Sequence, residues 1–428
     1  MAYRRILITV TWVALSCTEA TSAPALTPNQ KRLNIESFEL IWSTIRDQYW
    51  DPDFGGVNWQ AVHDELRPKI EGAASMSDAR AVMSDMMDRL GKSHFGLIPA
   101  EVYEDLDAKG GEGTAGLEVR ILDGRAIVTS VEEGSPAASE GVHAGWEIRR
   151  VEGTALAPSL DKISAHYRDA TTQELYLARS VLAKLSGDPG SAVHVEFLDG
   201  ARRRVSKTLT RIQPQGTPAK FGYLPTIHVW FRTSRPAEDT GYIAFNFFLD
   251  PAHLMPEFGD ALGKCAACPG VVIDLRGNPG GLGIMALGMA GWFIEKPDQR
   301  LGTMHMRQAP IKFTVNPRRP AYRGRVAMLV DACSASTSEI FAGGMKDLGR
   351  ARIFGTRTAG AALPSAIDRL PNGDAFQHAI ADYVSEGGRP LEGIGVIPDV
   401  EVKLTREALL AGRDPVLEAA IEWIHARR

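Results

Sequence analysis

A serine-rich segment that follows an apolar run has the spacing of a nucleophile placed at the start of a helix. The run Val326 to Val330 predicts a buried strand, and the letters SASTSE predict the opening of a helix that reaches about Leu348. Ser336 would then lie at a strand-to-helix turn, where the helix dipole and outward main-chain N–H groups can stabilise an oxyanion. The same letters also fit a capping box, in which Ser336 only satisfies the Glu339 amide. Ser336 is therefore a candidate nucleophile with a structural alternative.

A second segment, VVIDLRGNPGG from Val271 to Gly281, predicts another buried strand followed by a glycine-rich turn. Gly280 and Gly281 allow the main chain to approach a ligand closely, so one of them could donate an N–H group to an oxyanion. The alternative is an ordinary Pro-Gly turn after a strand.

Three motifs in order, DLRGNPGG, SASTSE and GTRTAG, resemble those of the C-terminal processing peptidases and of the tricorn protease core, a group of serine peptidases. The resemblance covers nearly all of the chain beyond the first 30 residues. It implies a crotonase-like α/β spiral for the catalytic domain, hydrolysis of peptide bonds, and no metal or organic cofactor.

The resemblance also narrows the choice of general base. In the processing-peptidase branch a lysine follows the Thr-x-Gly turn, but here Thr358 to Ala362 contains no lysine. Lys346 should point away from Ser336 as a solvated charge, because it lies ten residues further along the predicted helix. The tricorn-like branch instead uses a histidine, and Ser93 and His94 in LGKSHFGLIP match its Ser-His pair.

A glutamate completes the implied set. Glu392 in RPLEGIGVIPDVEV matches the glutamate of the tricorn-like pattern, although a charged residue at a Gly-rich turn is its structural alternative. His94 would accept the proton of Ser336, while Ser93 and Glu392 would orient the imidazole. The Thr337 amide, with an amide of Gly280 or Gly281, would stabilise the oxyanion.

Alternating short strands from residue 110 to 212 indicate a β-rich insertion. The letters GTAGLEVR and GSPAASEGVHAGWEIRRVEG resemble a PDZ domain. In that fold the loop Ala115, Gly116 and Leu117 would present amides to the C-terminal carboxylate of a peptide. A module used only for packing or gating is the alternative.

The remaining pattern predicts an α/β protein with four segments. Residues 1–25 predict a signal peptide, 30–105 a helical bundle that carries the Ser-His motif, 110–212 the PDZ-like insertion, and 215–428 the α/β peptidase domain. Predicted strands include 242–247, 271–275, 325–330 and 352–354, and a last helix is expected over 406–425.

The first residues favour export. Arg4 and Arg5 precede an apolar run from Ile6 to Leu15 that is too short to span a bilayer, and small residues follow. A periplasmic or extracellular protein is expected. A lipoprotein anchored through Cys17 is the alternative, and only that form would have the membrane as a partner.

Charge and cysteine content argue against a nucleic-acid-binding protein and against a zinc site. A net charge of −4 supplies no basic surface for nucleic acid. Cys265 and Cys268 lack the second ligand pair of a zinc site, so no metal is expected and a structural pair or a disulfide is favoured. Cys333 is expected to pack beneath the serine turn, with a thiol nucleophile as the alternative.

The sequence therefore predicts an exported serine endopeptidase that cuts extended or unfolded polypeptides through an acyl-enzyme, with substrate C-termini as a point of recognition. The competing hypothesis is a catalytically silent protein of the same fold that binds a peptide or a lipophilic ligand. Acyl-CoA chemistry on the related crotonase fold is a third, weaker hypothesis.

Overall fold

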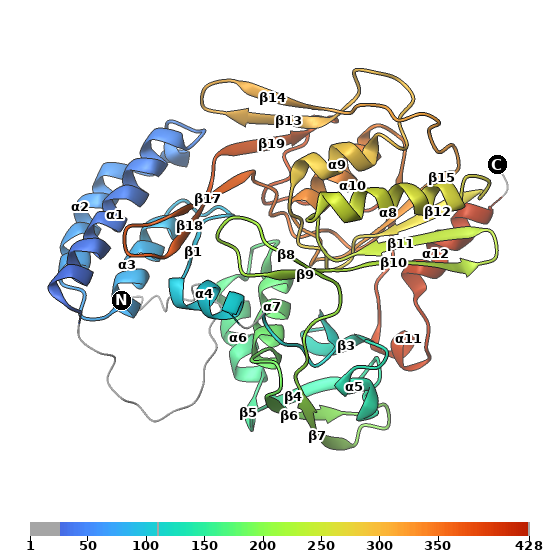
Figure 1. The fold of residues 1–428 in the computed structure, drawn as a ribbon, viewed down its shortest axis with the longest axis horizontal. Coiled ribbons are helices and arrows are strands. Elements are labelled where there is room, and N and C mark those ends of the chain that lie inside the picture. Colours follow the sequence, from blue (N-terminus) through green and yellow to red (C-terminus); the bar gives the residue numbers. More distant parts are fainter. Residues whose placement is uncertain (1–25, 109–110, 427–428) are drawn as a thin grey trace.

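The computed structural model describes residues 26–108 and 111–426 (Figure 1). The expected signal peptide and Cys17 lie outside the described residues. Three helices open the described chain: α1 (Pro28–Gln48), α2 (Trp59–Glu71) and α3 (Met76–Asp88). Side chains of Thr27, Asn58 and Ser75 cap their first turns by accepting amide hydrogen bonds. The apolar faces of the three helices share one core.

A small antiparallel sheet attaches these helices to the rest of the molecule. It has the order β1-β18-β17, in which β1 (Gly96–Ile98) follows α3 and precedes α4 (Ala100–Ala108), whereas β17 (Ser365–Arg369) and β18 (Ala375–Ala379) come from the other end of the chain. Phe376 of β18 is buried in the core of the N-terminal helices. His94 consequently lies where the helical region meets the C-terminal half.

Residues 111–212 contain an antiparallel sheet of order β2-β3-β4-β6-β7, with β5 paired to β4. The strands are β2 (Leu117–Leu122), β3 (Arg125–Val131), β4 (Glu147–Val151), β5 (Thr154–Ala155), β6 (Ala192–Leu198) and β7 (Arg204–Thr210). It also contains α5 (Pro136–Ser139), α6 (Ala157–His166) and α7 (Gln173–Leu185). The alternating pattern predicts strands only, so α6 and α7 are additions that the sequence pattern does not indicate.

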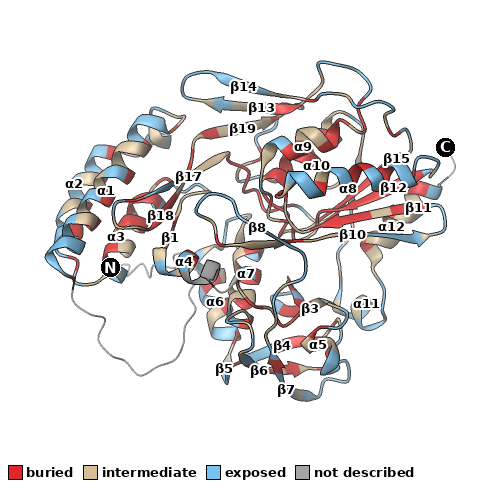
Figure 2. Cartoon of the chain, viewed as in Figure 1, coloured by how far each residue is buried: buried red, intermediate tan, exposed pale blue. Residues whose placement is uncertain are grey.

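A six-stranded sheet of order β10-β11-β12-β15-β16-β20 forms the centre of the C-terminal half. Its strands are β10 (Phe231–Ala237), β11 (Thr240–Phe245), β12 (Gly270–Asp274), β15 (Arg325–Val330), β16 (Arg352–Gly355) and β20 (Val400–Glu401). All neighbours except β10 and β11 are parallel. The inner strands β11, β12, β15 and β16 are largely buried, whereas the edge strand β10 is mostly exposed (Figure 2).

Helices cover both faces of this sheet. One face packs against α8 (Pro251–Lys264), α9 (Gly283–Ala290) and α10 (Thr337–Asp347), and the other against α12 (Pro415–His425). Val271 and Ile273 belong to the first core and Val272 to the second, as the alternation of a strand requires. The single last helix predicted over 406–425 is wrong: α11 (Arg406–Leu410) ends before Gly412 and α12 begins at Pro415.

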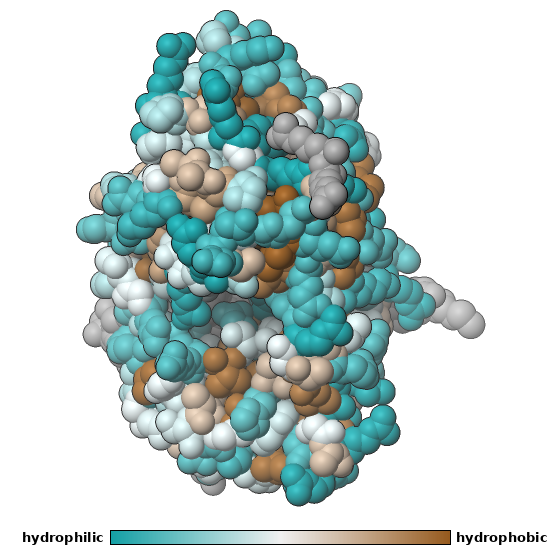
Figure 3. All heavy atoms as spheres, turned by 90° about the vertical axis from the view of Figure 1, so that its right-hand side faces the viewer, coloured by the Kyte–Doolittle hydropathy of each residue, from teal (hydrophilic) through white to brown (hydrophobic). Residues whose placement is uncertain are grey.

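Two further sheets complete the described fold. One has the order β14-β13-β19, from β13 (Arg300–Met306), β14 (Pro310–Thr314) and β19 (Ala381–Ser385), and the other pairs β8 (Thr217–Ala219) with β9 (Ile227–Val229). The face in Figure 3 is mostly hydrophilic, with apolar residues in small groups. Over the described ranges, no helix is both long and apolar enough to cross a membrane.

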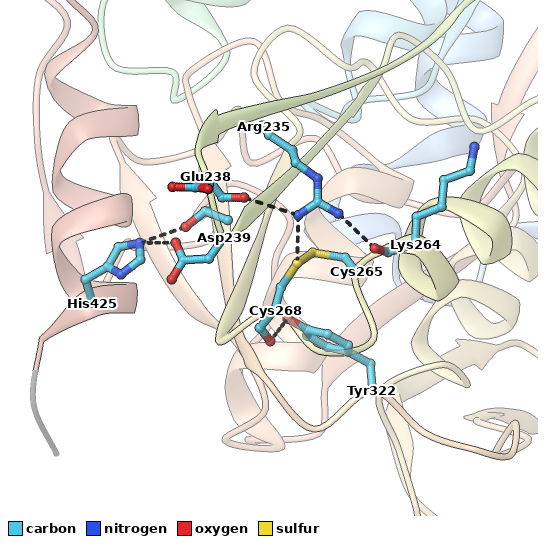
Figure 4. The surroundings of a disulfide bond; sticks show 9 residues. Arg235, Glu238, Asp239, Lys264, Cys265, Cys268, Tyr322 and His425 are labelled. Carbon is cyan, nitrogen blue, oxygen red and sulfur yellow. Dashed lines mark hydrogen bonds and ion pairs between the residues drawn. A yellow bond between two sulfur atoms is a disulfide. The ribbon is translucent and has the colours of Figure 1, made fainter.

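The CxxC pair is a disulfide between Cys265 and Cys268, one of the two forms that the sequence favoured (Figure 4). It lies after α8, where Tyr322 donates to the Cys268 carbonyl oxygen at 3.1 Å and Arg235 Nη1 lies 3.3 Å from the Cys268 sulfur. Cys333 is a free, buried thiol. Among the described residues, no group of His, Cys, Asp and Glu side chains is arranged to hold a metal ion.

Candidate active site

Ser336 lies in a strained turn between β15 and α10. We call residues 331–336 the serine turn. Ser336 has φ 56° and ψ −119°, a region that costs a non-glycine residue of order 1–3 kcal/mol and is often found at functional sites. Its amide donates to the Ala361 carbonyl oxygen at 2.8 Å and to the Glu339 carboxylate at 3.0 Å. The strain is thus held by specific contacts at the N-terminus of a buried helix.

Glu339 holds the serine turn against the Thr-Ala-Gly turn. Its side chain is fully buried and accepts hydrogen bonds from the Thr358 hydroxyl at 2.5 Å, the Gly360 amide at 2.8 Å and the Ala361 amide at 3.0 Å. Burial raises the pKa of Glu339 to about 7, although these donors oppose the rise. Sequence reasoning gave Glu339 only a capping role; its place in the SASTSE motif was the signal that could have identified it.

The glycine loop, residues 275–281, lies directly against the serine turn. A Cβ atom on Gly280 would lie 2.7 Å from the Ser336 Cβ and 2.8 Å from the Thr337 nitrogen, so only glycine fits there. The Thr337 hydroxyl donates to the Gly281 carbonyl oxygen at 2.7 Å. The structure therefore brings the predicted oxyanion residues beside Ser336.

The two glycines differ in the availability of their amides. The Gly280 amide donates to the Asn278 side-chain oxygen at 2.9 Å and is used inside its own loop. Within the described ranges, neither the Gly281 amide nor the Thr337 amide donates a hydrogen bond. Of the predicted donors, Thr337 and Gly281 are therefore the available pair.

Ser93, His94 and Glu392 form a continuous hydrogen-bonded chain. The Ser93 hydroxyl lies 2.8 Å from Glu392 Oε2 and 2.7 Å from His94 Nδ1, and the Ser93 amide donates to Glu392 Oε1 at 2.8 Å. Because the hydroxyl proton goes to the carboxylate, the hydroxyl oxygen accepts from Nδ1–H. The Nε2 atom of His94 is therefore left with its lone pair.

The surroundings of these groups shift their pKa values. Burial, reinforced by the positive charge of Arg179 on α7, lowers the pKa of His94 to about 4. Burial raises the pKa of Glu392, although hydrogen bonds from Ser93 and the Ala362 amide oppose the rise. The imidazole is thus neutral at neutral pH, as a general base requires.

Residues 361 and 362 connect the histidine chain to the serine turn. The Glu392 carboxylate accepts from the Ala362 amide at 3.1 Å, and the preceding residue, Ala361, accepts from the Ser336 amide. Residues from the N-terminal helical region, the serine turn and the C-terminal part of the chain therefore meet at one place.

The Lys346 ammonium and the Cys333 thiol do not belong to this hydrogen-bonded set. The expectation that Lys346 is a solvated charge is wrong, because its ammonium group lies 3.0 Å from Asp399 and donates to the Ile397 carbonyl oxygen. Burial raises the pKa of the Cys333 thiol to about 12, which keeps the sulfur protonated and weakens the alternative of a thiol nucleophile.

The loop predicted to bind a peptide carboxylate, Ala115 to Leu117, is not part of the hydrogen-bonded chain of Ser93, His94 and Glu392. Ala115 and Leu117 are buried, and the Gly116 amide donates to the Thr114 hydroxyl at 3.0 Å, so part of the loop's donor capacity is used internally. Ala115 and Leu117 share an apolar cluster with Cys333 and Ala335 of the serine turn. The antiparallel region therefore packs against the back of that turn.

Comparisons with known proteins identify the kind of protein that this chain resembles. Residues 239–402 match the model of peptidase family S41, and residues 34–88 match the tricorn protease C1 domain. The chain is 26% identical to carboxyl-terminal-processing peptidase 3 of Arabidopsis thaliana over 84% of this chain and 67% of that protein. It is 26% identical to a carboxyl-terminal-processing protease of Synechocystis over 89% and 83% of the two chains. With a putative tricorn protease homolog of Streptomyces coelicolor it shares 24% identity over 90% of this chain and 32% of that protein.

Solved structures support the mixed α/β fold. The photosystem II D1 C-terminal processing protease superposes with a TM-score of 0.60 at 22% identity, covering 94% of this chain and 98% of that one. Mature CPAF superposes with a TM-score of 0.63 at 14% identity, covering 92% and 97%. From the match over residues 239–402 and the carboxyl-terminal-processing relatives, the chain is a serine peptidase, and these findings support its placement in peptidase family S41.

Proposed function

We propose that this protein is an exported endopeptidase of the tricorn-like branch, which cuts extended or unfolded polypeptides through an acyl-enzyme. The observation that carries the proposal is the chain Glu392–Ser93–His94, which leaves Nε2 of a neutral imidazole as a base. A lysine in that role is not needed.

In the proposed first step, Ser336 Oγ attacks the carbonyl carbon of the scissile peptide while His94 Nε2 takes the hydroxyl proton. The Thr337 and Gly281 amides stabilise the oxyanion that forms. When the C–N bond breaks, His94 returns the proton to the leaving amine and an ester to Ser336 remains. A water molecule then attacks this ester, with His94 again taking and returning one proton.

Ser93 and Glu392 would act by keeping the imidazole in one tautomer and by offsetting the positive charge that it gains. The charge of Glu392 acts on the imidazole through the Ser93 hydroxyl, which lies between the two groups. No step requires the carboxylate itself to contact the substrate. This role explains why a partly buried glutamate accepts hydrogen bonds from Ser93 and Ala362.

Substrate recognition is proposed from the relatives and from the antiparallel region. The names of two relatives refer to carboxyl-terminal processing, so a polypeptide cut near its C-terminus is the substrate class that we propose. We further propose that residues 110–212 form a PDZ-like module, that the helices before it form a separate bundle, and that the α/β half is a crotonase-like spiral. Export to the periplasm or the exterior rests on the N-terminal sequence.

The proposal is tested by mass spectrometry of the mature protein after incubation with a fluorophosphonate probe. One adduct on Ser336 is expected, absent in Ser336→Ala and strongly slowed in His94→Ala. Ser43→Ala and His63→Ala, on the N-terminal helices, should label like the wild type. A folded wild type that gains no adduct but still binds a peptide or a lipophilic ligand would favour the binding-protein hypothesis.

A further inference from the structure

A buried ion pair connects the antiparallel region to the serine turn. Arg120 on β2 lies with Nε 2.7 Å from Asp331 Oδ2, and the side chains are only 14% and 18% exposed. Asp331 is the first residue after β15. The strand that carries Arg120 begins at Leu117, in the predicted peptide-binding loop.

The Asp331 carboxylate holds both segments of the candidate active site. Its Oδ1 atom accepts from the Gly277 amide at 2.9 Å and from the Cys333 amide at 2.9 Å, and the Ser334 hydroxyl lies 3.3 Å away. Gly277 belongs to the glycine loop, whereas Cys333 and Ser334 belong to the serine turn. One side chain therefore sets the position of the oxyanion donor relative to the nucleophile.

Arg120 packs directly on the glycine loop. A Cβ atom on Gly277, whose φ is 74°, would overlap the Arg120 guanidinium, so this contact requires a glycine. Burial alone would raise the pKa of Asp331, but the Arg120 charge and the amide donors outweigh it and lower the pKa. The carboxylate thus stays ionised as long as Arg120 is present.

We propose that Arg120 is a positioning residue for peptide hydrolysis, which ties the PDZ-like module to the serine turn and the glycine loop through Asp331. The inference rests on the function proposed above and adds a residue that touches neither the substrate nor His94. Without Arg120, Asp331 is a buried, uncompensated carboxylate, which must rotate toward water or take up a proton. Either change loosens the Gly277 and Cys333 amides and displaces the oxyanion donor.

The test compares Arg120→Gln, Asp331→Asn and the double variant with Arg80→Gln as a matched control. Arg80 lies 2.7 Å from the buried Asp374, is 16% exposed, and belongs to the N-terminal helices. The kcat and KM for a peptide, the labelling rate of Ser336 and the melting temperature are measured for each. Arg120→Gln should lower kcat and the labelling rate by about 10- to 100-fold with KM nearly unchanged. Arg80→Gln should lower the melting temperature with kcat nearly unchanged.

The double variant distinguishes positioning from simple destabilisation. The losses of Arg120→Gln and Asp331→Asn should be non-additive, because both act through one ion pair. A folded Arg120→Gln with the kcat of Arg80→Gln would overturn the inference. If Arg120→Gln does not fold, Asp331→Asn decides, because it removes the charge and keeps the volume; a wild-type kcat there would overturn the inference.

The same measurements separate this inference from the proposed function. A wild type that neither labels at Ser336 nor cuts peptides would contradict the function itself. A wild type that does both, with Arg120 and Asp331 variants that label at the same rate, would contradict only the role of Arg120.

Discussion

The Ser93 hydroxyl and the Glu392 carboxylate lie 2.8 Å apart although 299 positions separate them in the chain. Because the hydroxyl proton points to the carboxylate, the hydroxyl oxygen faces His94 Nδ1 and accepts its hydrogen. The contact makes the imidazole a base with a defined tautomer, and it joins the N-terminal helical region to the turn beside Ala362.

Replacing Ser93 with alanine should lower kcat by about 10²-fold, within the range of a general-base contribution. The physical reason is that His94 would sample both tautomers and lose its link to Glu392. Steady-state hydrolysis of a peptide measures the loss. Ser43→Ala, which also removes a helical-region hydroxyl, should behave as the wild type, and equal rates for the two variants would contradict the role of Ser93.

The pH dependence should be displaced to acid. An unperturbed imidazole would put the rise of activity near pH 6.5, but the lowered pKa of His94, about 4, moves it. Since the neutral ring is the active form, kcat/KM should rise as pH increases through about 4 and be nearly flat above about pH 6. A midpoint at or above 6.5 in protein shown to be folded by circular dichroism would contradict this expectation.

Arg179→Gln should move the same midpoint upward. The positive charge of Arg179 disfavours the imidazolium, so its removal makes His94 easier to protonate. Burial of the ring has the larger effect, and the midpoint should therefore stay below that of an ordinary histidine. Comparison of kcat/KM profiles for the variant and the wild type measures the shift, and a downward shift would contradict the assigned cause.

Gly280→Ala should slow the labelling of Ser336 by more than a loss of folding stability would explain. The added Cβ would lie 2.8 Å from the Thr337 nitrogen, so the Thr337 amide must move away from the oxyanion. We expect a loss of about 10²-fold in kcat, similar to the loss of one oxyanion donor. Gly263→Ala on α8, where a Cβ has open space, is the matched control and should keep full activity.

Glu339→Gln should destabilise the protein by about 2–3 kcal/mol, because an amide presents an N–H group where the carboxylate accepted from main-chain donors. The donors affected are the amides of Ser336, Gly360 and Ala361. Urea unfolding measures the free energy. An unchanged unfolding midpoint would show that these contacts do not hold the serine turn.

Local sequence patterns specified the elements where burial is continuous. The apolar run Val326 to Val330 predicted β15 almost residue for residue, since a strand buried on both faces needs an unbroken apolar segment. Patterns failed where the signal was interrupted. The alternating strand pattern does not indicate helices α6 and α7. Periodicity predicts one last helix, whereas Gly412 and Pro415 separate α11 from α12.

By itself the sequence determined the strand-to-helix turn around Ser336 and the apolar runs of the central sheet, because φ/ψ preference, periodicity and glycine placement are properties of neighbouring residues. Its motifs supplied Ser93, His94 and Glu392 through resemblance. Only the tertiary structure decided how these segments meet, which glycine amide remains available, and that Arg120 is paired with Asp331. It also set the pKa of His94, because desolvation and the charge of Arg179 come from chain segments distant in sequence.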